Sequence, residues 1–576
     1  MRMVVDLSDV LFYLRHHDTL SGIQRVQLGL ARALIDAPAP LPHELIFVTS
    51  NGAGTHYLEL AEADILALID LLAAATVSHE ALKRVVTGAE RFSPDYEPQP
   101  GDVFLLLGAF WVMENVFAQI AELKRSGVFV VILIHDIIPI THPEFCDKAL
   151  TDSFNLFFSS VIITADLVMT VSDYTGETVR RLLRERNISV PLATLREAHR
   201  TWTPRQLEAA TSGQPRPLVA NPRYVCYVST IEVRKNHLYL FQIWKQLITE
   251  LGDATPTLVF VGRPGWRVGD FMDQLESTDF LDRRIQILNG LSDIELASLY
   301  RDCLFTVFPS FVEGWGLPVG ESLMFGRPCV ASGTTSVPEV GGPFVDYVDP
   351  LSVPDGYGKI KRLIVDDEYR EVRTAQISAQ FVCRSWEDVA ADLIAILDQY
   401  VPSNPGAVRP VPPPLLPPGF YPFGHGNAMS RFVRSGLAAQ ALLMCDANWY
   451  GVEDFGRWMR GRRGVVRFRV PYEGAQRVRI VVALDTPPWF SNTVRVTCNT
   501  VCRTDVVLKP GGTTPVEFRV ACYNGTVDLA FEILEEIEAD EKDLRPLSIG
   551  LRSIAFAGDA DLEARVHILE GLMGIE

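Results

Sequence analysis

Short apolar segments alternate with helical patterns up to about residue 400, and this alternation constrains the fold more than any other feature. VFVVILI (128–134) and LFTVFP (304–309) are apolar almost throughout, as expected of strands buried on both faces. HLYLFQIWKQLITEL (237–251) has instead the spacing of a helix with one apolar face. Further strands are expected at 103–109, 167–172, 224–230, 257–262, 285–290 and 328–332. This repetition predicts an α/β fold with parallel sheets covered by helices on both sides.

The length of this region predicts two such domains. About 400 residues are too many for one doubly wound unit. The stretch 190–222 holds several prolines and few strand signals, so we place the hinge there. We therefore expect one Rossmann-like domain at residues 1–205 and a second at 206–400, closed by the amphipathic helix of SWEDVAADLIAILDQY (385–400).

The pattern changes after residue 400. Residues 401–423 contain nine prolines in 23 positions, which predicts a stiff, extended linker, set at 401–422. Short segments beyond it alternate polar and apolar residues at period two, which predicts an antiparallel β-sandwich or jelly roll over 423–576. The segment 428–444 is expected to form an amphipathic helix that packs on the protein rather than anchoring it in a membrane. Strands are expected at 465–470, 477–484, 493–498, 516–521, 527–534 and 549–556.

Charge and cysteine usage limit the partners and the compartment. The balance of 53 basic and 71 acidic residues gives a formal charge of −18, which argues against nucleic acid as the main partner. Nine cysteines are scattered without a CxxC or Cys/His cluster, which indicates reduced thiols in the cytoplasm and no zinc site. No signal-peptide layout and no run of roughly 18 apolar residues is apparent. We expect a cytoplasmic protein, with peripheral contact to the inner face of the plasma membrane left open.

LSGIQRVQLGLARAL (20–34) carries the first candidate anion site. Ser21 and Gly22 precede apolar residues at helical spacing, so they mark the N-terminus of a helix. Such a terminus offers unpaired N–H groups and a partial positive charge, and glycine lets a phosphate approach closely. An ordinary helix cap is the alternative. The chain has neither a GxGxxG nor a GxxxxGK[ST] motif at this loop.

STIEVRKNHLYLF (229–241) carries the second candidate anion site. Arg234 and Lys235 follow the strand at 224–230 and precede the next helix. Ligands of open α/β sheets bind beyond the carboxyl ends of the strands, and two adjacent cations there suit a diphosphate. An exposed basic pair is the alternative, but cations near a helix N-terminus oppose the helix dipole, so we expect an anion beside them.

FVEGWGLPVGES (311–322) places two carboxylates on either side of a glycine-rich turn. The glycines and Pro318 exclude a continuous helix from 313 to 320, so Glu313 is expected on a loop and Glu321 at the start of the helix ESLMFG. A carboxylate can accept two hydrogen bonds from a diol of a ribose or another sugar. A helix-capping Glu321 and a solvated Glu313 are the alternative.

Together these segments resemble one family. EGWGLPVGE is similar to the E-x7-E element of the retaining family 4 glycosyltransferases of GT-B fold. The glycine loop SGIQR, the His-Asp segment IHDIIPITHPEF (134–145) and the basic STIEVRKN resemble further elements of that family, in its order and spacing. The resemblance covers roughly residues 1–400 and leaves the last 150 or so uncovered.

The resemblance implies transfer of a sugar from a nucleotide diphosphate sugar, with retention at the anomeric carbon and no required metal or other cofactor. It implies that Arg234 and Lys235 bind the diphosphate and stabilise its charge as it leaves. Backbone groups of Gly22, Leu317 and Pro318 are implied to assist.

The resemblance also assigns roles around the sugar. Glu321 is implied to bind the ribose hydroxyls, Glu313 hydroxyls of the donor sugar, and His135 to lie near the reaction centre. A buried, hydrogen-bonded histidine is the alternative for His135. Trp315 and Gly320 depart from the family, which more often has a phenylalanine and a bulkier apolar residue there, so the sugar pocket is expected to differ in shape.

Donor, acceptor and mechanism stay open at this point. The family uses GDP- or UDP-linked hexoses of the mannose, glucose, fucose or rhamnose type, and its default acceptor is a glycan or lipid-linked oligosaccharide of bacterial surface polysaccharide. Front-face attack, with the leaving phosphate taking the acceptor's proton, is favoured over a double displacement through Glu313. A metal-dependent transferase is disfavoured, because the clear DxD, at 559–561, follows the last expected strand. A catalytically silent carbohydrate-binding or scaffold protein is the remaining alternative.

Two hypotheses remain for the C-terminal β-domain. It binds the growing glycan through aromatic residues such as Trp449, Trp458 or Trp489, or it docks on the catalytic domains or on a second copy of the chain. Docking is favoured, because tryptophans are more often core than platform.

Overall fold

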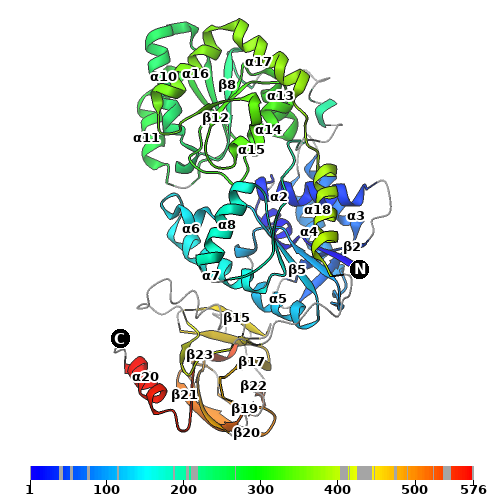
Figure 1. Cartoon of the computed structure of the whole chain (residues 1–576), viewed down its shortest axis with the longest axis vertical. Helices are drawn as coiled ribbons and strands as arrows, with labels where there is room; N and C mark the ends of the chain where they lie inside the picture. Colours follow the sequence, from blue (N-terminus) through cyan, green and yellow to red (C-terminus); the bar gives the residue numbers. More distant parts are fainter. Residues whose placement is uncertain are drawn as a thin grey trace.

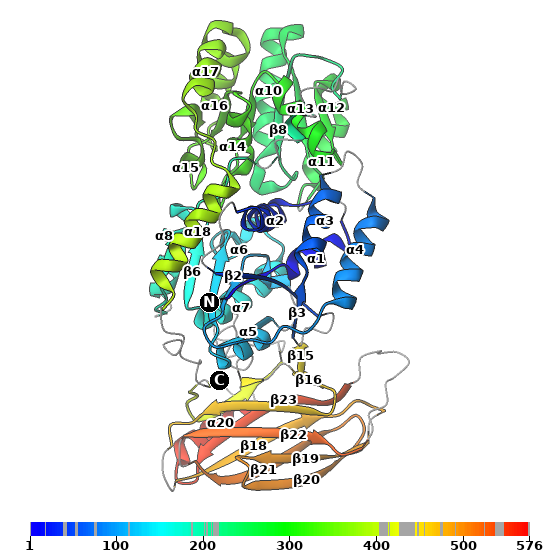
Figure 2. The same cartoon turned by 90° about the vertical axis from the view of Figure 1, so that its right-hand side faces the viewer.

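Three bodies lie one after another along the long axis of the molecule. In the computed structural model (Figure 1) the N-terminal domain occupies the centre, the second α/β domain lies on one side of it and the β-sandwich on the other. The turned view in Figure 2 shows the same order. The structure describes residues 2–17, 19–37, 43–51, 56–73, 78–112, 116–185, 188–200, 202, 206–208, 210, 218–265, 267–402, 413, 415–424, 444–445, 448–453, 455–472, 476–489, 491–522, 525–535 and 547–573.

The first domain is built on a seven-stranded sheet of order β3-β2-β1-β4-β5-β6-β7, parallel except for β3. Val4 at its centre pairs with Ile46 on one side and Phe104 on the other, and the central strands are buried, as the uninterrupted apolar segments predict. Its strands are β1 (Arg2–Asp6), β2 (Glu44–Ser50), β3 (Tyr57–Leu60), β4 (Val103–Leu106), β5 (Phe129–Ile134), β6 (Leu167–Thr170) and β7 (Leu192–Thr194). Its helices are α1 (Ser8–Leu14), α2 (Gly22–Ile35), α3 (Glu62–Leu72), α4 (His79–Phe92), α5 (Val116–Arg125), α6 (Ile138–Thr141), α7 (Lys148–Thr164) and α8 (Asp173–Glu185), with short 3-10 turns η1 (Phe110–Val112) and η2 (Pro143–Phe145).

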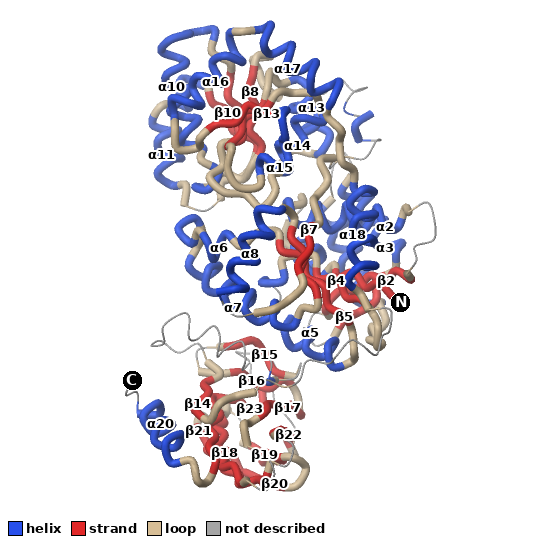
Figure 3. Tube along the Cα trace, viewed as in Figure 1, coloured by secondary structure: helices blue, strands red, loops and turns tan. Residues whose placement is uncertain are grey.

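The second domain is built on a six-stranded parallel sheet of order β10-β9-β8-β11-β12-β13. Figure 3 shows helices beside this sheet and beside the first, which confirms the predicted pair of doubly wound α/β units. Its strands are β8 (Tyr224–Val228), β9 (Thr257–Val261), β10 (Ile285–Leu288), β11 (Thr306–Phe308), β12 (Cys329–Ser332) and β13 (Val345–Val348). Its helices are α10 (His237–Leu251), α11 (Gly269–Ser277), α12 (Asp279–Arg283), α13 (Asp293–Asp302), α14 (Leu317–Met324), α15 (Val337–Gly341), α16 (Val353–Val365) and α17 (Asp367–Gln380), with 3-10 turns η3 (Val233–Lys235), η4 (Gly252–Ala254) and η5 (Gly342–Phe344).

The helix expected to close the second domain packs on the first domain instead. α18 (Trp386–Tyr400) lies against α2, and a Cβ on Gly29 would come within 2.4 Å of the Trp386 ring, so only glycine lets the two helices approach this closely. The chain therefore crosses between the domains twice. The two crossings are paired, because the His199 amide donates to the Arg384 carbonyl at 2.9 Å and the Arg384 amide to His199 Nδ1 at 3.1 Å.

The C-terminal region is an antiparallel sandwich, as predicted. One sheet has the order β15-β16-β23-β18-β21, with β14 pairing β23, and the other the order β17-β22-β19-β20. Their inward side chains form one buried apolar core. The strands are β14 (Gly419–Pro422), β15 (Trp449–Val452), β16 (Arg457–Arg460), β17 (Arg463–Arg469), β18 (Arg477–Asp485), β19 (Asn492–Cys498), β20 (Cys502–Leu508), β21 (Thr513–Ala521), β22 (Thr526–Ile533) and β23 (Leu547–Gly558), followed by α20 (Leu562–Met573).

The linker before the sandwich is shorter than predicted. The predicted linker 401–422 is too long, because its last four residues form β14 and pair with β23. The amphipathic helix predicted at 428–444 lies outside the described residues, apart from Met444. Among the residues that are described, no helix is both long and apolar enough to cross a membrane. All nine cysteines are free thiols.

Candidate active site

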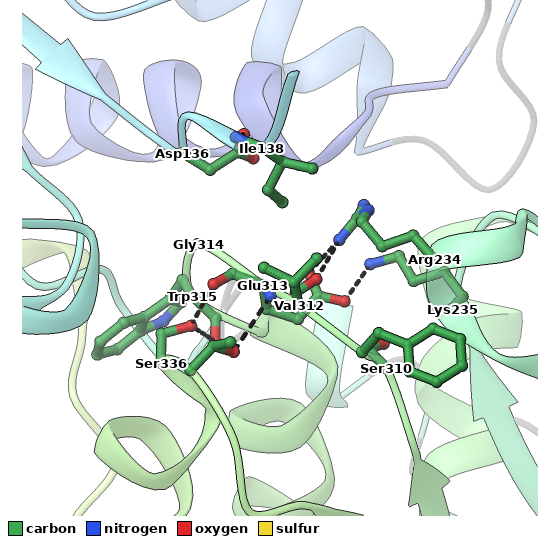
Figure 4. Close-up of polar contacts among 12 residues, drawn as sticks. Asp136, Ile138, Arg234, Lys235, Ser310, Val312, Glu313, Gly314, Trp315 and Ser336 are labelled. Atoms are coloured by element: carbon green, nitrogen blue, oxygen red, sulfur yellow. Dashed lines mark hydrogen bonds and ion pairs between the residues drawn. The ribbon is translucent and has the colours of Figure 1, made fainter. Parts of the chain in front are cut away.

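The two predicted cations and the first predicted glutamate form one cluster. β8 and β11 are neighbours in the second sheet, so η3 after β8 and the loop after β11 lie side by side at its carboxyl edge. Arg234 Nη1 donates to Glu313 Oε2 at 2.7 Å, and Lys235 Nζ to Glu313 Oε1 at 2.6 Å (Figure 4). Arg234 also donates to the Val312 carbonyl at 2.9 Å and to Glu232 Oε1 at 2.7 Å. Sequence reasoning expected an anion beside the cations but did not identify either carboxylate as that partner.

Burial and mutual attraction set the charges of this cluster. Burial disfavours the ionised Glu313, but Arg234 and Lys235 outweigh it and lower the pKa of Glu313 to about 2. The pKa of Arg234 is raised, because Glu313 and Glu232 outweigh the cost of burial. The pKa of Lys235 is lowered by burial and by the neighbouring Arg234. At neutral pH Glu313 is therefore an ionised acceptor that is already bound by two cations.

Glu321 lies deeper in its helix than predicted. α14 begins at Leu317, with Gly316 before it at φ 117° and Pro318 in the first turn, where the missing proline N–H costs nothing. The expected helix start at Glu321 is therefore wrong by one turn. Glu321 is buried and accepts a 2.7 Å hydrogen bond from the Tyr300 hydroxyl. Its neighbour in space, Tyr300, carries no motif that sequence reasoning could have used.

Two helix N-termini meet across the boundary between the domains. A Cβ on Gly22, the first residue of α2, would lie 4.0 Å from the side chain of Leu317, the first residue of α14. Helix N-termini attract anions through their free N–H groups and their partial positive charge. The structure thus brings together Gly22, Leu317 and Pro318, which the sequence assigned to one phosphate site.

The His135 ring is bound by the protein on both sides. Its Nδ1 lies 3.2 Å from Glu197 Oε1 and its Nε2 2.9 Å from the Leu107 carbonyl oxygen. Both partners are acceptors, so the protonated ring can donate from both nitrogens. Burial would lower the pKa of His135, but the hydrogen bond and charge of Glu197 raise it. The ring is thus fixed by Glu197 and Leu107, whereas its backbone faces the loop of Glu313.

Gly314 brings that loop against the first domain. A Cβ at Gly314 would lie 2.0 Å from the His135 carbonyl oxygen and 3.0 Å from Asp136 Cβ, so no other residue fits here without a shift. Figure 4 shows Asp136 across from the cluster, where its Oδ1 accepts the Ile138 amide at 2.9 Å. Burial raises the pKa of Asp136. Asp136 is a carboxylate of the first domain that faces the site, and sequence reasoning did not single it out.

His199 explains both departures from the family pattern. Its ring stacks on Trp315, with centroids 6.3 Å apart and planes 7° from parallel. A Cβ on Gly320 would lie 2.9 Å from His199 Cδ2, so Gly320 makes room for the same ring. Burial lowers the pKa of His199 to about 4, helped by the nearby Arg384 charge, so the ring is neutral at pH 7. The pairing of a larger ring at 315 with a glycine at 320 was the sequence signal.

The remaining candidates lie in the sandwich. Trp449 is fully buried, as expected of a core residue, while Trp458 is half-buried and Trp489 is 39% exposed. The Asp559–Asp561 stretch follows β23 as a turn, and Asp561 accepts from the Tyr472 hydroxyl at 2.9 Å. Within the described part of the chain, no group of three or more potential ligands is arranged to hold a metal ion.

Comparison with known proteins decides the family. The model of the glycosyl transferases group 1 family matches residues 222–363, which include the whole cluster. O-antigen chain mannosyltransferase B of Escherichia coli is 31% identical over 263 residues, covering 45% of this chain and 68% of the relative. The chain belongs to the family 4 (group 1) glycosyltransferases. This glycosyltransferase is also 24% identical over 351 residues to the serotype-specific mannosyltransferase WbdA of Escherichia coli, covering 57% of this chain and 37% of that one.

Two further similarities are more limited. The MMP alpha-(1->4)-mannosyltransferase of Mycolicibacterium hassiacum is 34% identical over 162 residues, covering 27% of this chain and 35% of that one. Among solved structures, trehalose-6-phosphate synthase OtsA overlaps with a TM-score of 0.48 at 14% identity, covering 70% of this chain and 100% of that one. The assignment to GT-B fold rests on the two parallel sheets of this glycosyltransferase and on its family, not on that overlap.

Proposed function

We propose that this glycosyltransferase moves a hexose from a GDP- or UDP-linked donor to a glycan or lipid-linked acceptor of bacterial surface polysaccharide, with retention at the anomeric carbon and without a metal. Mannose from GDP-mannose is the first donor to test, since the named relatives are mannosyltransferases. Fucose-, glucose- and rhamnose-type donors are the further arms of that test.

One observation carries the proposal: two half-buried cations lie at the carboxyl edge of a parallel sheet, in a domain whose α14 N-terminus meets that of α2. Arg234 offers a planar fork and Lys235 a compact charge, a combination that suits a diphosphate. Both side chains stabilise the leaving group as the bond between the sugar and the phosphate breaks. Their positive charge neutralises the leaving diphosphate, as a metal ion does in other transferases.

Glu313 suits binding better than nucleophilic attack. Its carboxylate is ionised, with a pKa of about 2, and each oxygen already accepts from a cation, which lowers its nucleophilicity. In the proposed step the acceptor oxygen attacks the anomeric carbon from the face that the phosphate leaves. The bond from carbon to phosphate oxygen breaks, and the phosphate oxygen takes the acceptor's proton. Glu313 binds a sugar hydroxyl, Glu321 the ribose, and His135 holds the backbone beside Gly314.

The β-domain and the location of the protein complete the proposal. We place this glycosyltransferase in the cytoplasm, in peripheral contact with the inner membrane face where lipid-linked acceptors lie, with the sandwich serving docking or self-association. Removing residues 403–576, so that β14 leaves with its sheet, tests this by light scattering and by product length. Fewer subunits per assembly with unchanged product length support docking, and an unchanged number of subunits with shorter products supports glycan binding.

Nucleotide binding tests the donor site itself. Thermal shift with a panel of nucleoside diphosphates and nucleotide sugars should raise the melting temperature for one base, because a ligand of the native state stabilises it by mass action. Lys235→Ala should lose that shift. Lys245→Ala, an exposed lysine on α10, is the matched control and should keep it. No shift with any nucleotide, or equal shifts in both variants, refutes the site.

A further inference from the structure

The first helix turn of α8 is capped by a carboxylate from the other domain. The amides of Asp173 and Tyr174 donate to Glu339 Oε2 at 2.7 Å and Oε1 at 2.8 Å. α8 follows β6 of the first domain, whereas Glu339 lies on α15 of the second. No motif in the sequence pairs these two positions, which are more than 160 residues apart. The contact exists only while the two domains are together.

α8 has a cap of its own, but that cap is incomplete. Ser172 Oγ accepts the Thr175 amide at 3.1 Å, which satisfies one of the free N–H groups of the first turn. The two amides before it are the ones that Glu339 accepts. A carboxylate at this end of a helix also gains from the helix dipole. The N-terminus of α8 is therefore completed by closure of the domains.

The short helix that carries Glu339 is tied to the loop of Glu313. Ser336 Oγ, immediately before α15, donates to the carbonyls of Glu313 at 2.9 Å and Trp315 at 3.0 Å (Figure 4). The Glu313 amide in turn donates to Thr335 Oγ1 at 3.2 Å. The position of Glu339 is thus coupled through three hydrogen bonds to the backbone on both sides of Gly314.

α8 also contacts the loop of Glu313 directly, so the contacts form a closed loop. Thr175 Oγ1, one helix residue after the amides that Glu339 accepts, donates to the Gly314 carbonyl at 3.3 Å. The hydrogen bonds therefore run from Gly314 through α8 to Glu339, and from there through Ser336 back to Glu313 and Trp315. A shift of α8 away from Glu339 would break the Thr175 contact and release the loop from the first domain.

We propose that Glu339 is a positioning residue: it holds α8 of the first domain against the second domain, a contact called the latch below, and so fixes the loop of Glu313 for transfer. Its kinetic consequence rests on the proposed function, whereas the latch itself is a property of the two domains. Glu339 touches neither donor nor acceptor in this scheme. It acts through the relative position of the domains.

Glu339→Gln is the sharpest test, because glutamine keeps the size but has one acceptor oxygen and no charge. One amide of α8 then faces an NH2 group. We expect faster hydrogen exchange at the Asp173 and Tyr174 amides and a larger radius of gyration by X-ray scattering in the presence of GDP or UDP. We expect about a tenfold fall in kcat/KM for transfer, the loss expected for one charge-assisted hydrogen bond. The dissociation constant of free GDP or UDP should stay within about twofold of the wild-type value. Residues that share no contacts usually change each other's free energies by only a few tenths of a kcal/mol.

Ser172→Ala is the matched control, since Ser172 caps the same helix and itself makes no hydrogen bond to the second domain; its hydroxyl donates to Thr175 Oγ1 at 2.9 Å, within the first domain. It should lower the melting temperature and leave the radius of gyration unchanged. Equal radius and equal amide exchange in wild type and Glu339→Gln overturn the latch, and so does an equal loss of transfer in Ser172→Ala. If wild type transfers no sugar from any donor, the proposed function fails, while scattering and exchange still decide the latch.

Discussion

Replacing Glu313 by glutamine should destabilise the second domain by an amount that depends on pH. The Glu313 pKa lies near 2 instead of 4.5 because Arg234 and Lys235 favour the ionised form over the cost of burial. That difference corresponds to about 3 kcal/mol at about 1.4 kcal/mol per pKa unit. Removing one partner of a buried ion pair typically costs about 3–5 kcal/mol, a similar magnitude.

The contribution of Glu313 to stability falls as the pH falls. Glu313 has a lower pKa in the folded than in the unfolded protein, so its contribution is complete above about pH 4.5 and is lost as the pH falls towards about 2. Urea unfolding at pH 7 should therefore separate wild type from Glu313→Gln by about 3 kcal/mol, and the gap should narrow below about pH 5. Glu368→Gln, an exposed glutamate on α17, should change neither value.

The result that refutes this reasoning is a gap below about 1 kcal/mol at pH 7, the range of an exposed ion pair. A large gap that does not change with pH also refutes it, because the cost would then arise from packing and not from the charge of Glu313. Adding the cognate nucleoside diphosphate should narrow the gap at pH 7, since its phosphates supply the lost negative charge.

Three further predictions concern the contacts around this cluster. Gly314→Ala should lower transfer by about tenfold or more, because its Cβ would lie 2.0 Å from the His135 carbonyl oxygen; an unchanged rate contradicts the close contact. Gly320→Ala should lower stability by about 1–3 kcal/mol in thermal unfolding through overlap with His199, and the added change His199→Ala should recover part of that loss. The His135 pKa is raised, so its pair with Glu197 stabilises the protein fully below about pH 6.5 and less as the pH rises through the folded pKa; Glu197→Gln should remove that slope from melting temperatures measured between pH 6 and 9.

The sheets could be predicted because their signal is local. Continuous apolar runs form β4, β5, β8 and β9. Such runs between helical patterns are typical of parallel strands that are buried on both faces. The expected strands did not include β1, β2, β3, β7 or β13; β7 (Leu192–Thr194) is only three residues long and half-buried. α14 was expected to begin four residues late, because the sequence does not show that Gly316 adopts a left-handed conformation that starts the helix before Pro318.

The candidate site was predictable in its residues but not in their partners. Arg234, Lys235, Gly22 and Leu317 follow strand ends or begin helices, so topology brings them to one edge. Contacts between residues of different domains produce no pattern in the sequence around either residue. The contact of Glu339, on α15, with the first turn of α8 is the main example, and the packing of α18 on α2 is another. His199 left only an indirect sign, in the paired departures at Trp315 and Gly320.

The stereochemistry of the first product formed tests the central claim most directly. Wild-type protein should be mixed with GDP-mannose, or with the donor that gives the largest thermal shift, and an acceptor glycan, and the anomeric proton followed by NMR from the first minutes. The account predicts that the new linkage has the anomeric configuration of the donor, and that Lys235→Ala loses the signal while Lys245→Ala keeps it. An inverted linkage, or a signal that survives in Lys235→Ala at the wild-type rate, would contradict it.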